Sequence, residues 1–161
     1  MKRRHLAEKY CPVARASAQI VDGWTFIILR EIFLGNARFS GLQKQSGMSP
    51  RSLTLRLRKL EDEGILERRT SEEGKAAKVY TLTPKGHGLW PTLITLKQWG
   101  DEWCGPWAED DAALRTMHRG TDHEMHAVLV CQTCGEPVST HTTYTVLSKC
   151  MQAERDAAEA V

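Results

Sequence analysis

The sequence lacks the patterns that would place it in a membrane, outside the cell or in a common enzyme class. Its longest apolar stretch, 24–34, falls short of the roughly 18 residues of a membrane span and is interrupted by Arg30 and Glu31. The basic residues 1–5 are not followed by the apolar core or cleavage site of a signal peptide, which favours a cytoplasmic protein. No Gly-rich phosphate loop, G-x-S-x-G or H-E-x-x-H pattern is present, so we expect no enzyme.

The five cysteines form an odd set, and no secretion signal accompanies them. A disulfide framework is therefore not expected, and each thiol is a core residue, a metal ligand or a reactive group. The cysteines are Cys11, Cys104, Cys131, Cys134 and Cys150.

The charge of the chain is divided unevenly between its two halves. Residues 1–80 carry 16 Lys and Arg against 9 Asp and Glu, whereas residues 81–161 carry 6 against 11. The net charge of +7 in the first half and −5 in the second suggests that the first half binds a polyanion. Chance clustering of charges would give the same division.

Helix start and stop signals follow one another through the first half. Pro12 suits the first position of a helix, and the apolar stretch 24–34 reads as a buried helix that closes at Gly35. Ser40 with Gln43 forms a capping box, which predicts a short helix starting at Ser40 and stopping near residue 47.

The next helix, 49–63, has the clearest signals. Ser49 is a good N-cap and Pro50 fits the first helical position. The leucines at 53, 57 and 60 recur at helical spacing and form one apolar stripe. Two helices joined by a short turn that contains glycine predict a helix-turn-helix.

A hairpin and a long helix are predicted next. Strands at 65–70 and 78–82 bracket a polar loop at 71–75, so a wing follows the helix-turn-helix. Thr83 caps a helix over 84–103 that contains Pro91 near its start. The predicted fold class is α+β and mainly helical, a winged helix-turn-helix with a long C-terminal helix.

A set of short motifs runs in order through residues 11–103. They are Cys11-Pro12-Val13, Gly23-Trp24-Thr25, Ile28-Leu29-Arg30-Glu31, Arg38-Phe39-Ser40, Met48-Ser49-Pro50, Gly64-Ile65-Leu66-Glu67-Arg68, Tyr80-Thr81-Leu82-Thr83 and Lys85-Gly86. With these motifs the segment resembles the HxlR family of bacterial winged-helix transcription regulators, which is MarR-like. The resemblance implies a homodimer that binds a pseudo-palindromic operator on double-stranded DNA, usually near the regulator's own gene.

We expect three regions. Residues 1–107 form the DNA-binding and dimerisation domain, 108–149 a small β-rich extension, and 150–161 a frayed helix or disordered tail. Strands in the extension are expected at 127–130 and 142–146. The homodimer is expected to pair through the N-terminal helix and the 84–103 helix, because the latter carries a broad aromatic stripe. The same stripe would also suit packing within one chain.

Helix 49–63 is expected to lie in the major groove, with the wing 67–79 on the flanking backbone. Base-reading candidates are Arg51, Ser52 and Leu55, and either base or phosphate contacts are expected from Thr54 and Arg56. Ser49, at the helix start, is also counted among the DNA-binding residues. Phosphate contacts are expected from Arg58, Lys59, Lys75 and Lys78, with Arg68 or Arg69, and from Arg38 with the helix start at Ser40. Any one of these basic residues could instead lie on a solvated helix face.

Cys11 stands directly before Pro12 at a helix start, with the basic residue Lys9 close by. Within the resembling family, a subgroup uses a cysteine at this position as a thiol switch, so Cys11 is a redox-sensing candidate. The alternative is a small residue that packs the first helix against the partner subunit.

The extension contains the pattern Cys131-x-x-Cys134-Gly, which can hold zinc from one side. His118 and His123 are the nearest further ligands, and no second C-x-x-C is present, so the knuckle could equally be a simple turn. A thioredoxin-like role is disfavoured because no βαβ pattern surrounds the pair. The predicted function is a dimeric DNA-binding regulator; the alternatives are a winged-helix module that binds protein and a zinc-binding accessory protein.

Overall fold

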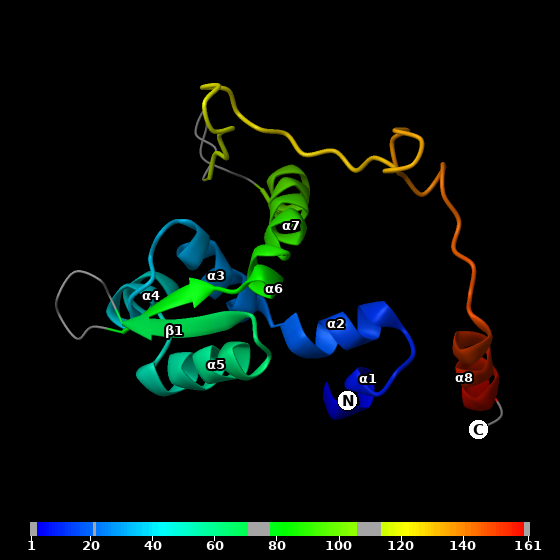
Figure 1. Cartoon of the computed structure of the whole chain (residues 1–161), viewed down its shortest axis with the longest axis horizontal. Coiled ribbons are helices and arrows are strands. Elements are labelled where there is room, and N and C mark those ends of the chain that lie inside the picture. Colours follow the sequence, from blue (N-terminus) through cyan, green and yellow to red (C-terminus); the bar gives the residue numbers. More distant parts are fainter. Residues whose placement is uncertain (1–2, 21, 71–77, 106–113, 160–161) are drawn as a thin grey trace. The chain divides into compact units, whose positions relative to one another are not determined.

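The computed structural model describes residues 3–20, 22–70, 78–105 and 114–159 (Figure 1). These residues belong to two compact units, one containing residues 1–90 with 149–161 and the other residues 91–148. None of the helices in the described ranges is both long and apolar enough to cross a membrane.

The first unit is a helical bundle with a two-stranded wing. Its elements are α1 (Arg3–Ala7), α2 (Pro12–Ile20), α3 (Gly23–Phe33), α4 (Phe39–Ser46), α5 (Pro50–Asp62), β1 (Leu66–Thr70), β2 (Lys78–Leu82), α6 (Pro84–His87) and α8 (Lys149–Glu159). The order of elements from α3 to β2 is that of a winged helix-turn-helix, as predicted. The tail, for which a frayed helix or disorder was expected, contains α8.

Helix α5 begins and ends as the sequence indicates. The Ser49 hydroxyl accepts a hydrogen bond from the backbone N–H of Ser52 at 3.2 Å, and Pro50 occupies the first turn. Gly64 follows the helix with a φ of +66°, in the left-handed region that glycine enters without strain.

Helix α4 begins earlier than its capping box predicts. Its N-cap is Arg38, which makes no side-chain cap, and Ser40 lies inside the helix. The residues just before α4 are paired with the wing, because Tyr80 donates its backbone N–H to the Ala37 carbonyl at 2.8 Å and Arg38 bridges Val79. This long-range pairing sets the start of α4, and the predicted start at Ser40 is wrong.

The wing is a two-stranded antiparallel sheet. Leu66 pairs with Leu82 and Thr70 with Lys78, so β1 and β2 are in register along their whole length. The loop predicted at 71–75, including Lys75, lies outside the described residues.

The predicted helix 84–103 is two helices, α6 and α7 (Trp90–Trp103), separated by Gly88 and Leu89. Thr83 caps α6 by accepting the Gly86 N–H at 3.1 Å. Pro91 occupies the second position of α7, where its missing N–H disturbs no helical hydrogen bond. The break at Gly88–Leu89 therefore accommodates the proline that a continuous helix would have to bend around.

The core of the first unit is made by α3, α4, α5 and the wing. The leucine stripe of α5 (Leu53, Leu57 and Leu60) is at most 1% exposed and packs with Ile28 and Leu29 of α3. Because the leucine side of α5 is buried in this core, the opposite side of the helix faces solvent.

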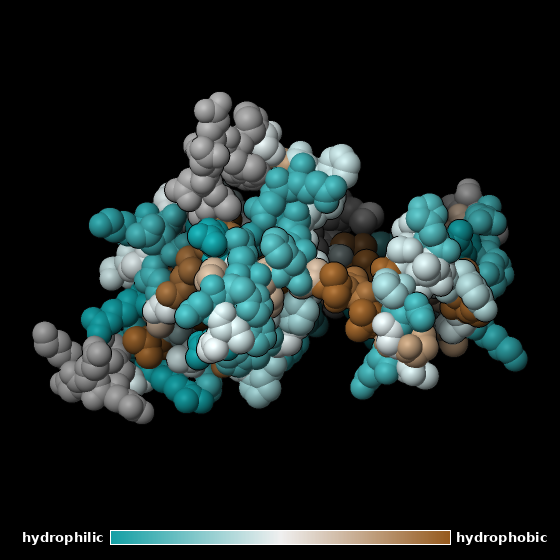
Figure 2. Space-filling model, turned by 90° about the horizontal axis from the view of Figure 1, so that it is seen from above, coloured by the Kyte–Doolittle hydropathy of each residue, from teal (hydrophilic) through white to brown (hydrophobic). Residues whose placement is uncertain are grey.

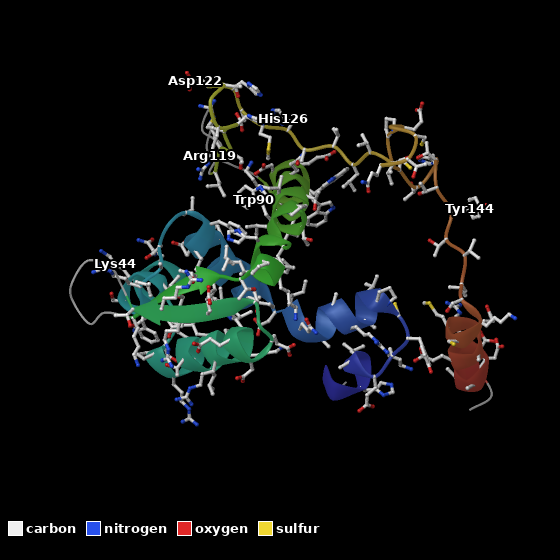
Figure 3. All side chains as sticks on the ribbon, viewed as in Figure 1. Lys44, Trp90, Arg119, Asp122, His126 and Tyr144 are labelled. Atoms are coloured by element: carbon white, nitrogen blue, oxygen red, sulfur yellow. The ribbon has the colours of Figure 1, made fainter. Side chains whose placement is uncertain are left out.

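The extension differs from the β-rich structure expected for residues 108–149. Its described residues form no β-strand, and two isolated antiparallel bridges join Met117 to Glu124 and Val130 to Pro137. Tyr144, which lies in one of the expected strands, is 90% exposed and projects from an extended segment (Figure 3). The branched and aromatic residues favour extended backbone here, but within the described ranges no strand pairs with them.

Candidate nucleic-acid interface

Helix α5 presents an outward stripe made of Arg51, Leu55 and Arg58. All three are exposed, and Leu55 is 57% exposed although it is apolar. They lie at i, i+4 and i+7 on the face opposite the buried leucines, so they share one side of the helix. The exposed leucine is suited to an apolar contact, and the arginines on either side of it are suited to contacts with anionic groups or hydrogen-bond acceptors.

The polar residues beside this stripe serve the helix itself. Ser49 and Ser52 form the N-terminal cap, and the Thr54 hydroxyl donates to the Pro50 carbonyl at 2.8 Å. Ser49 is exposed, and Ser52 and Thr54 are half-buried. These predicted contact residues thus lie at the N-terminal end of α5, where the helix dipole favours an anion.

Arg56 and Lys59 point away from the outward stripe and toward α2 and α3. The Arg56 guanidinium lies 3.2 Å from the Asp22 carboxylate, which also caps α3. Lys59 donates to the Ala18 carbonyl of α2 at 3.0 Å. Sequence reasoning assigned both residues to DNA and missed Asp22, whose N-cap position before α3 was the available signal.

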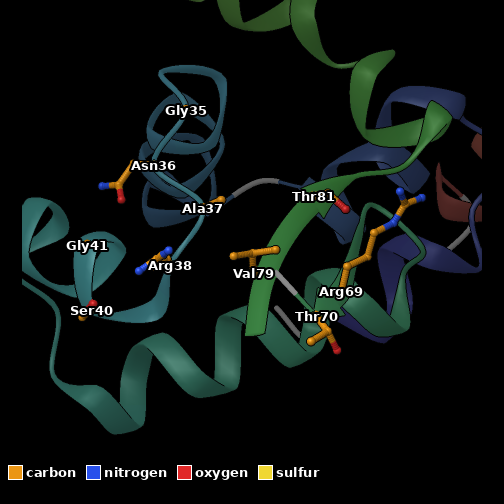
Figure 4. A pocket seen from close by; sticks show the side chains of 10 residues that line it. All are labelled: Gly35, Asn36, Ala37, Arg38, Ser40, Gly41, Arg69, Thr70, Val79 and Thr81. Carbon is orange, nitrogen blue, oxygen red and sulfur yellow. The ribbon is translucent and has the colours of Figure 1, made fainter. Parts of the chain in front are cut away.

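A second set of predicted residues lines one hollow beside the wing. Arg38, Ser40 and Arg69 belong to the walls of a pocket of 560 Å³ between the α3–α4 connection and the sheet. Figure 4 shows Arg38 and Arg69 on either side of Val79. Arg69 also pairs with Glu67 of its own strand. Two guanidinium groups and a hydroxyl at one hollow form a basic rim next to the wing.

Other wing residues add to this basic region. Lys78 is exposed at the start of β2, and Arg68 is exposed with its guanidinium 3.5 Å from Glu61. Burial and the nearby Glu61 carboxylate raise the pKa of Tyr80, with Arg68 acting against them. The tyrosine therefore stays neutral and leaves the rim basic.

Apolar side chains remain exposed in both units. In the first unit they include Tyr10, Val13, Trp24 and Leu34, and on α7 they include Leu96, Trp99 and Trp103. Figure 2 shows apolar surface interrupting the hydrophilic surface of the face it presents. The exposure of Tyr10, before α2, and of Val13, within α2, was not predicted, whereas Trp99 and Trp103 belong to the aromatic stripe expected on the 84–103 helix.

The cysteine candidates lie in different settings. Cys11 is a free, half-buried thiol at the start of α2. Cys131 and Cys134 share one turn, and backbone N–H groups of Cys134 and Thr133 lower the pKa of Cys131. His118 and His123 stack on each other with ring centroids 5.6 Å apart. Among the described residues, no group of three or more His, Cys, Asp or Glu side chains is placed to hold a metal, so the four zinc candidates do not form one site.

Comparison with known proteins decides the family. The sequence profile of the HxlR-like helix-turn-helix family matches residues 19–108. The chain belongs to this family. The match covers the helix-turn-helix, the wing and α7, so the HxlR-like region contains both α5 and the basic rim.

Relatives of this HxlR-like chain share more than the matched region. An uncharacterized HTH-type transcriptional regulator of Mycobacterium tuberculosis is 31% identical over 127 residues, which is 79% of this chain and 79% of the relative. The crystal structure of PA1607, a candidate transcription factor, has a TM-score of 0.78 at 30% identity and covers 89% of this chain and 99% of its own. The similarity to PA1607 therefore includes much of the extension.

A further solved relative is named as a redox regulator. The reduced form of the redox regulator HypR has a TM-score of 0.52 at 30% identity. It covers 57% of this chain and 92% of its own. The similarity to HypR thus concerns a little more than half of the chain.

Proposed function

We propose that this HxlR-like chain is a sequence-specific transcription regulator that binds double-stranded DNA as a homodimer. The observation that carries the proposal is the outward stripe of α5, in which Arg51, Leu55 and Arg58 stand exposed on a capped helix whose opposite side is core. In this proposal α5 enters the major groove and the wing lies on the flanking backbone. Such a regulator works where its DNA is, in the bacterial cytoplasm.

Each residue of the stripe has a role suited to its chemistry. Arg51, near the N-terminus of α5, can form two hydrogen bonds with a guanine edge, and Leu55 can contact a thymine methyl group. Arg58, two turns further on, contacts a phosphate. Arg56 and Lys59 remain proposed DNA contacts, and their contacts with Asp22 and the Ala18 carbonyl also hold α5 to α3 and α2.

The basic rim is proposed to hold the backbone next to the groove. Arg38 and Arg69 line one hollow, and Lys78 stands at the start of β2. Cationic side chains set the register of a protein on a duplex without reading its sequence. Ser40 contributes its hydroxyl inside α4, and Lys75 of the wing is included on the sequence argument alone.

The homodimer is proposed from the exposed apolar side chains. Val13 of α2 is 71% exposed, and Trp99 and Trp103 of α7 are 57% and 67% exposed. Large apolar residues on monomer surfaces mark interaction sites when they gather. A two-fold protein also matches a pseudo-palindromic operator, whose two half-sites present the same bases.

Cys11 is proposed as a thiol through which the regulator answers oxidants. The support is its position at the start of α2 and the similarity to the redox regulator HypR. Oxidation of Cys11 would alter α2, and Lys59 connects α2 to α5 through the Ala18 carbonyl. A Cys11→Ser variant that releases operator DNA under an oxidant as readily as the wild type would contradict this role.

Fluorescence anisotropy with DNA from the protein's own upstream region tests the main proposal. A scrambled duplex of equal length is titrated in parallel, at low and at moderate salt. We expect Arg51→Ala to weaken binding by about 1–3 kcal/mol and to reduce the preference for the upstream duplex. Arg155→Ala, which removes an exposed arginine from α8, is the matched control and should bind as the wild type does. Equal binding of both duplexes by the wild type would overturn the proposal.

A further inference from the structure

We propose that Cys131 and Cys134 form a reversible disulfide within the extension, making this turn a redox site that reacts with small-molecule disulfides. The site is separate from Cys11 and lies outside the region matched by the HxlR-like profile. It needs no ligand from elsewhere in the chain.

The turn that carries the two thiols is closed by backbone hydrogen bonds. Gly135 donates its N–H to the Cys131 carbonyl at 2.7 Å, and Cys131 donates to the Glu136 carbonyl at 2.9 Å. Gly135 has a φ of +76°, a left-handed conformation that lets the chain reverse directly after Cys134. Next to the turn, Val130 and Pro137 form an antiparallel bridge. The geometry of the pair is thus set by the backbone rather than by a packed core.

The closed turn also brings the two cysteines close together. The Cys131 carbonyl accepts the hydrogen bond that closes the turn, and Cys134 stands directly before the donor of that bond, Gly135. A disulfide requires two cysteines whose Cα atoms are close and whose side chains converge, and a single closed turn provides both. Cys134 is exposed and Cys131 half-buried, so a small oxidant can reach the pair.

The surroundings favour this use of the pair over metal binding. Tetrahedral zinc needs four ligands, and no third His, Cys, Asp or Glu joins the pair within the described part of the chain. The nearest candidates by sequence, His118 and His123, stack on each other beside the Met117–Glu124 bridge.

The reaction is a thiol–disulfide exchange in two steps. The Cys131 thiolate attacks one sulfur of an oxidised glutathione-type disulfide, which forms a mixed disulfide and releases one thiolate. The Cys134 thiolate then attacks the Cys131 sulfur, which forms the intrachain disulfide and releases the second thiolate. Two protein thiols lose two electrons and two protons, and the small disulfide becomes two thiols. The backbone N–H groups at Cys131 stabilise its thiolate, which makes Cys131 the attacking residue.

Mass spectrometry of the full chain tests the proposal. The reduced protein is incubated with oxidised glutathione, free thiols are blocked, and the peptide containing both cysteines is analysed. We expect this peptide to lose the mass of two hydrogen atoms, whereas Cys104 forms only a mixed disulfide. In a Cys134→Ser variant the mixed disulfide should stay trapped on Cys131.

A pair of glycine variants tests whether the turn itself is responsible. Gly135→Ala forces a Cβ into the left-handed region inside the turn, and Gly120→Ala does the same, at a φ of +78°, elsewhere in the extension. We expect Gly135→Ala to lower the equilibrium constant for the disulfide by about five- to thirtyfold. Gly120→Ala should leave it unchanged.

Three results would overturn the proposal. The first is a Cys131–Cys134 peptide that stays reduced while Cys104 is modified. The second is an equal effect of the two glycine variants. The third is stoichiometric zinc in the purified protein that is lost in Cys131→Ala, because the thiols would then be metal ligands.

Discussion

The winged-helix part of the first unit and residues 114–148 of the extension are stabilised in different ways. In the former, eight large side chains, among them Leu57, are at most 2% exposed and form one core. In the latter, every described residue is half-buried or exposed. The extension is instead held by local hydrogen bonds, such as those of Thr142 with Ser139 and Pro137. One chain thus combines a part stabilised by burial with a part stabilised by its turns.

Deleting core side chains should give the largest contrast between the two parts. Leu57→Ala removes a side chain that is 1% exposed and leaves a cavity, so we expect a loss of about 2–5 kcal/mol in the free energy of unfolding. Val128→Ala in the extension removes a side chain that is 79% exposed and should change it by less than about 0.5 kcal/mol. Urea denaturation followed by far-UV circular dichroism measures both. Equal losses would show that the extension has a core of its own.

Glycine variants test how closely the backbone is packed in the two units. A Cβ at Gly86 would lie 2.3 Å from the Ile65 carbonyl oxygen, so the chain would have to move. We expect Gly86→Ala to destabilise the first unit by about 1–3 kcal/mol. At Gly100 of α7 nothing lies within 4 Å, and Gly100→Ala should be neutral or stabilise the helix by up to about 1 kcal/mol. Thermal melts of the two variants compare them directly.

A smaller effect is expected at the cap of α5. Ser49→Ala removes the acceptor of the Ser52 N–H, which should cost about 1 kcal/mol of stability. Ser49→Asp keeps an acceptor and should restore most of that loss. If both variants melt at the same temperature as the wild type, the cap contributes nothing and the core alone holds α5.

The smallest effect concerns α8 and its contact with the turn before α2. The Lys9 ammonium and the Tyr10 N–H hold the Glu154 carboxylate and lower its pKa below the ordinary value of 4.5. The contact therefore stabilises the fold above that value, and its contribution is lost as the pH falls through the lowered pKa. Glu154→Gln should remove this part of the acid sensitivity. Hydrogen exchange at α8, followed between neutral and acidic pH, measures it.

The elements of the first unit could be predicted from the sequence because the residues that start and end each helix lie within a few positions of its ends. Ser49, Pro50 and Gly64 define α5 wherever the rest of the chain lies. The start of α4 was mispredicted because it depends on pairing with Val79, forty residues away. The predicted strands of the extension failed for the opposite reason: extended backbone alone does not provide a partner strand.

The same distinction explains the candidate interface. Helical spacing separates the outward stripe of α5 from its leucine stripe, so Arg51 and Leu55 could be chosen from the sequence. Arg56 could not be assigned in this way, because its partner Asp22 is brought to it only by the packing of α3 against α5. The gathering of Arg38 and Arg69 at one hollow likewise depends on the register of the wing.

The separation of two opposite stripes on α5 has a consequence for how regulators of this kind diversify. Positions 51, 55 and 58 face solvent, and their side chains are not part of the buried core cluster. Substitutions there leave the leucine packing and the ties of Arg56 and Lys59 in place, so they change fold stability little. With the DNA-reading role proposed for the outward stripe, a copy formed by gene duplication can exchange these side chains and acquire a new operator while it keeps the scaffold it inherited.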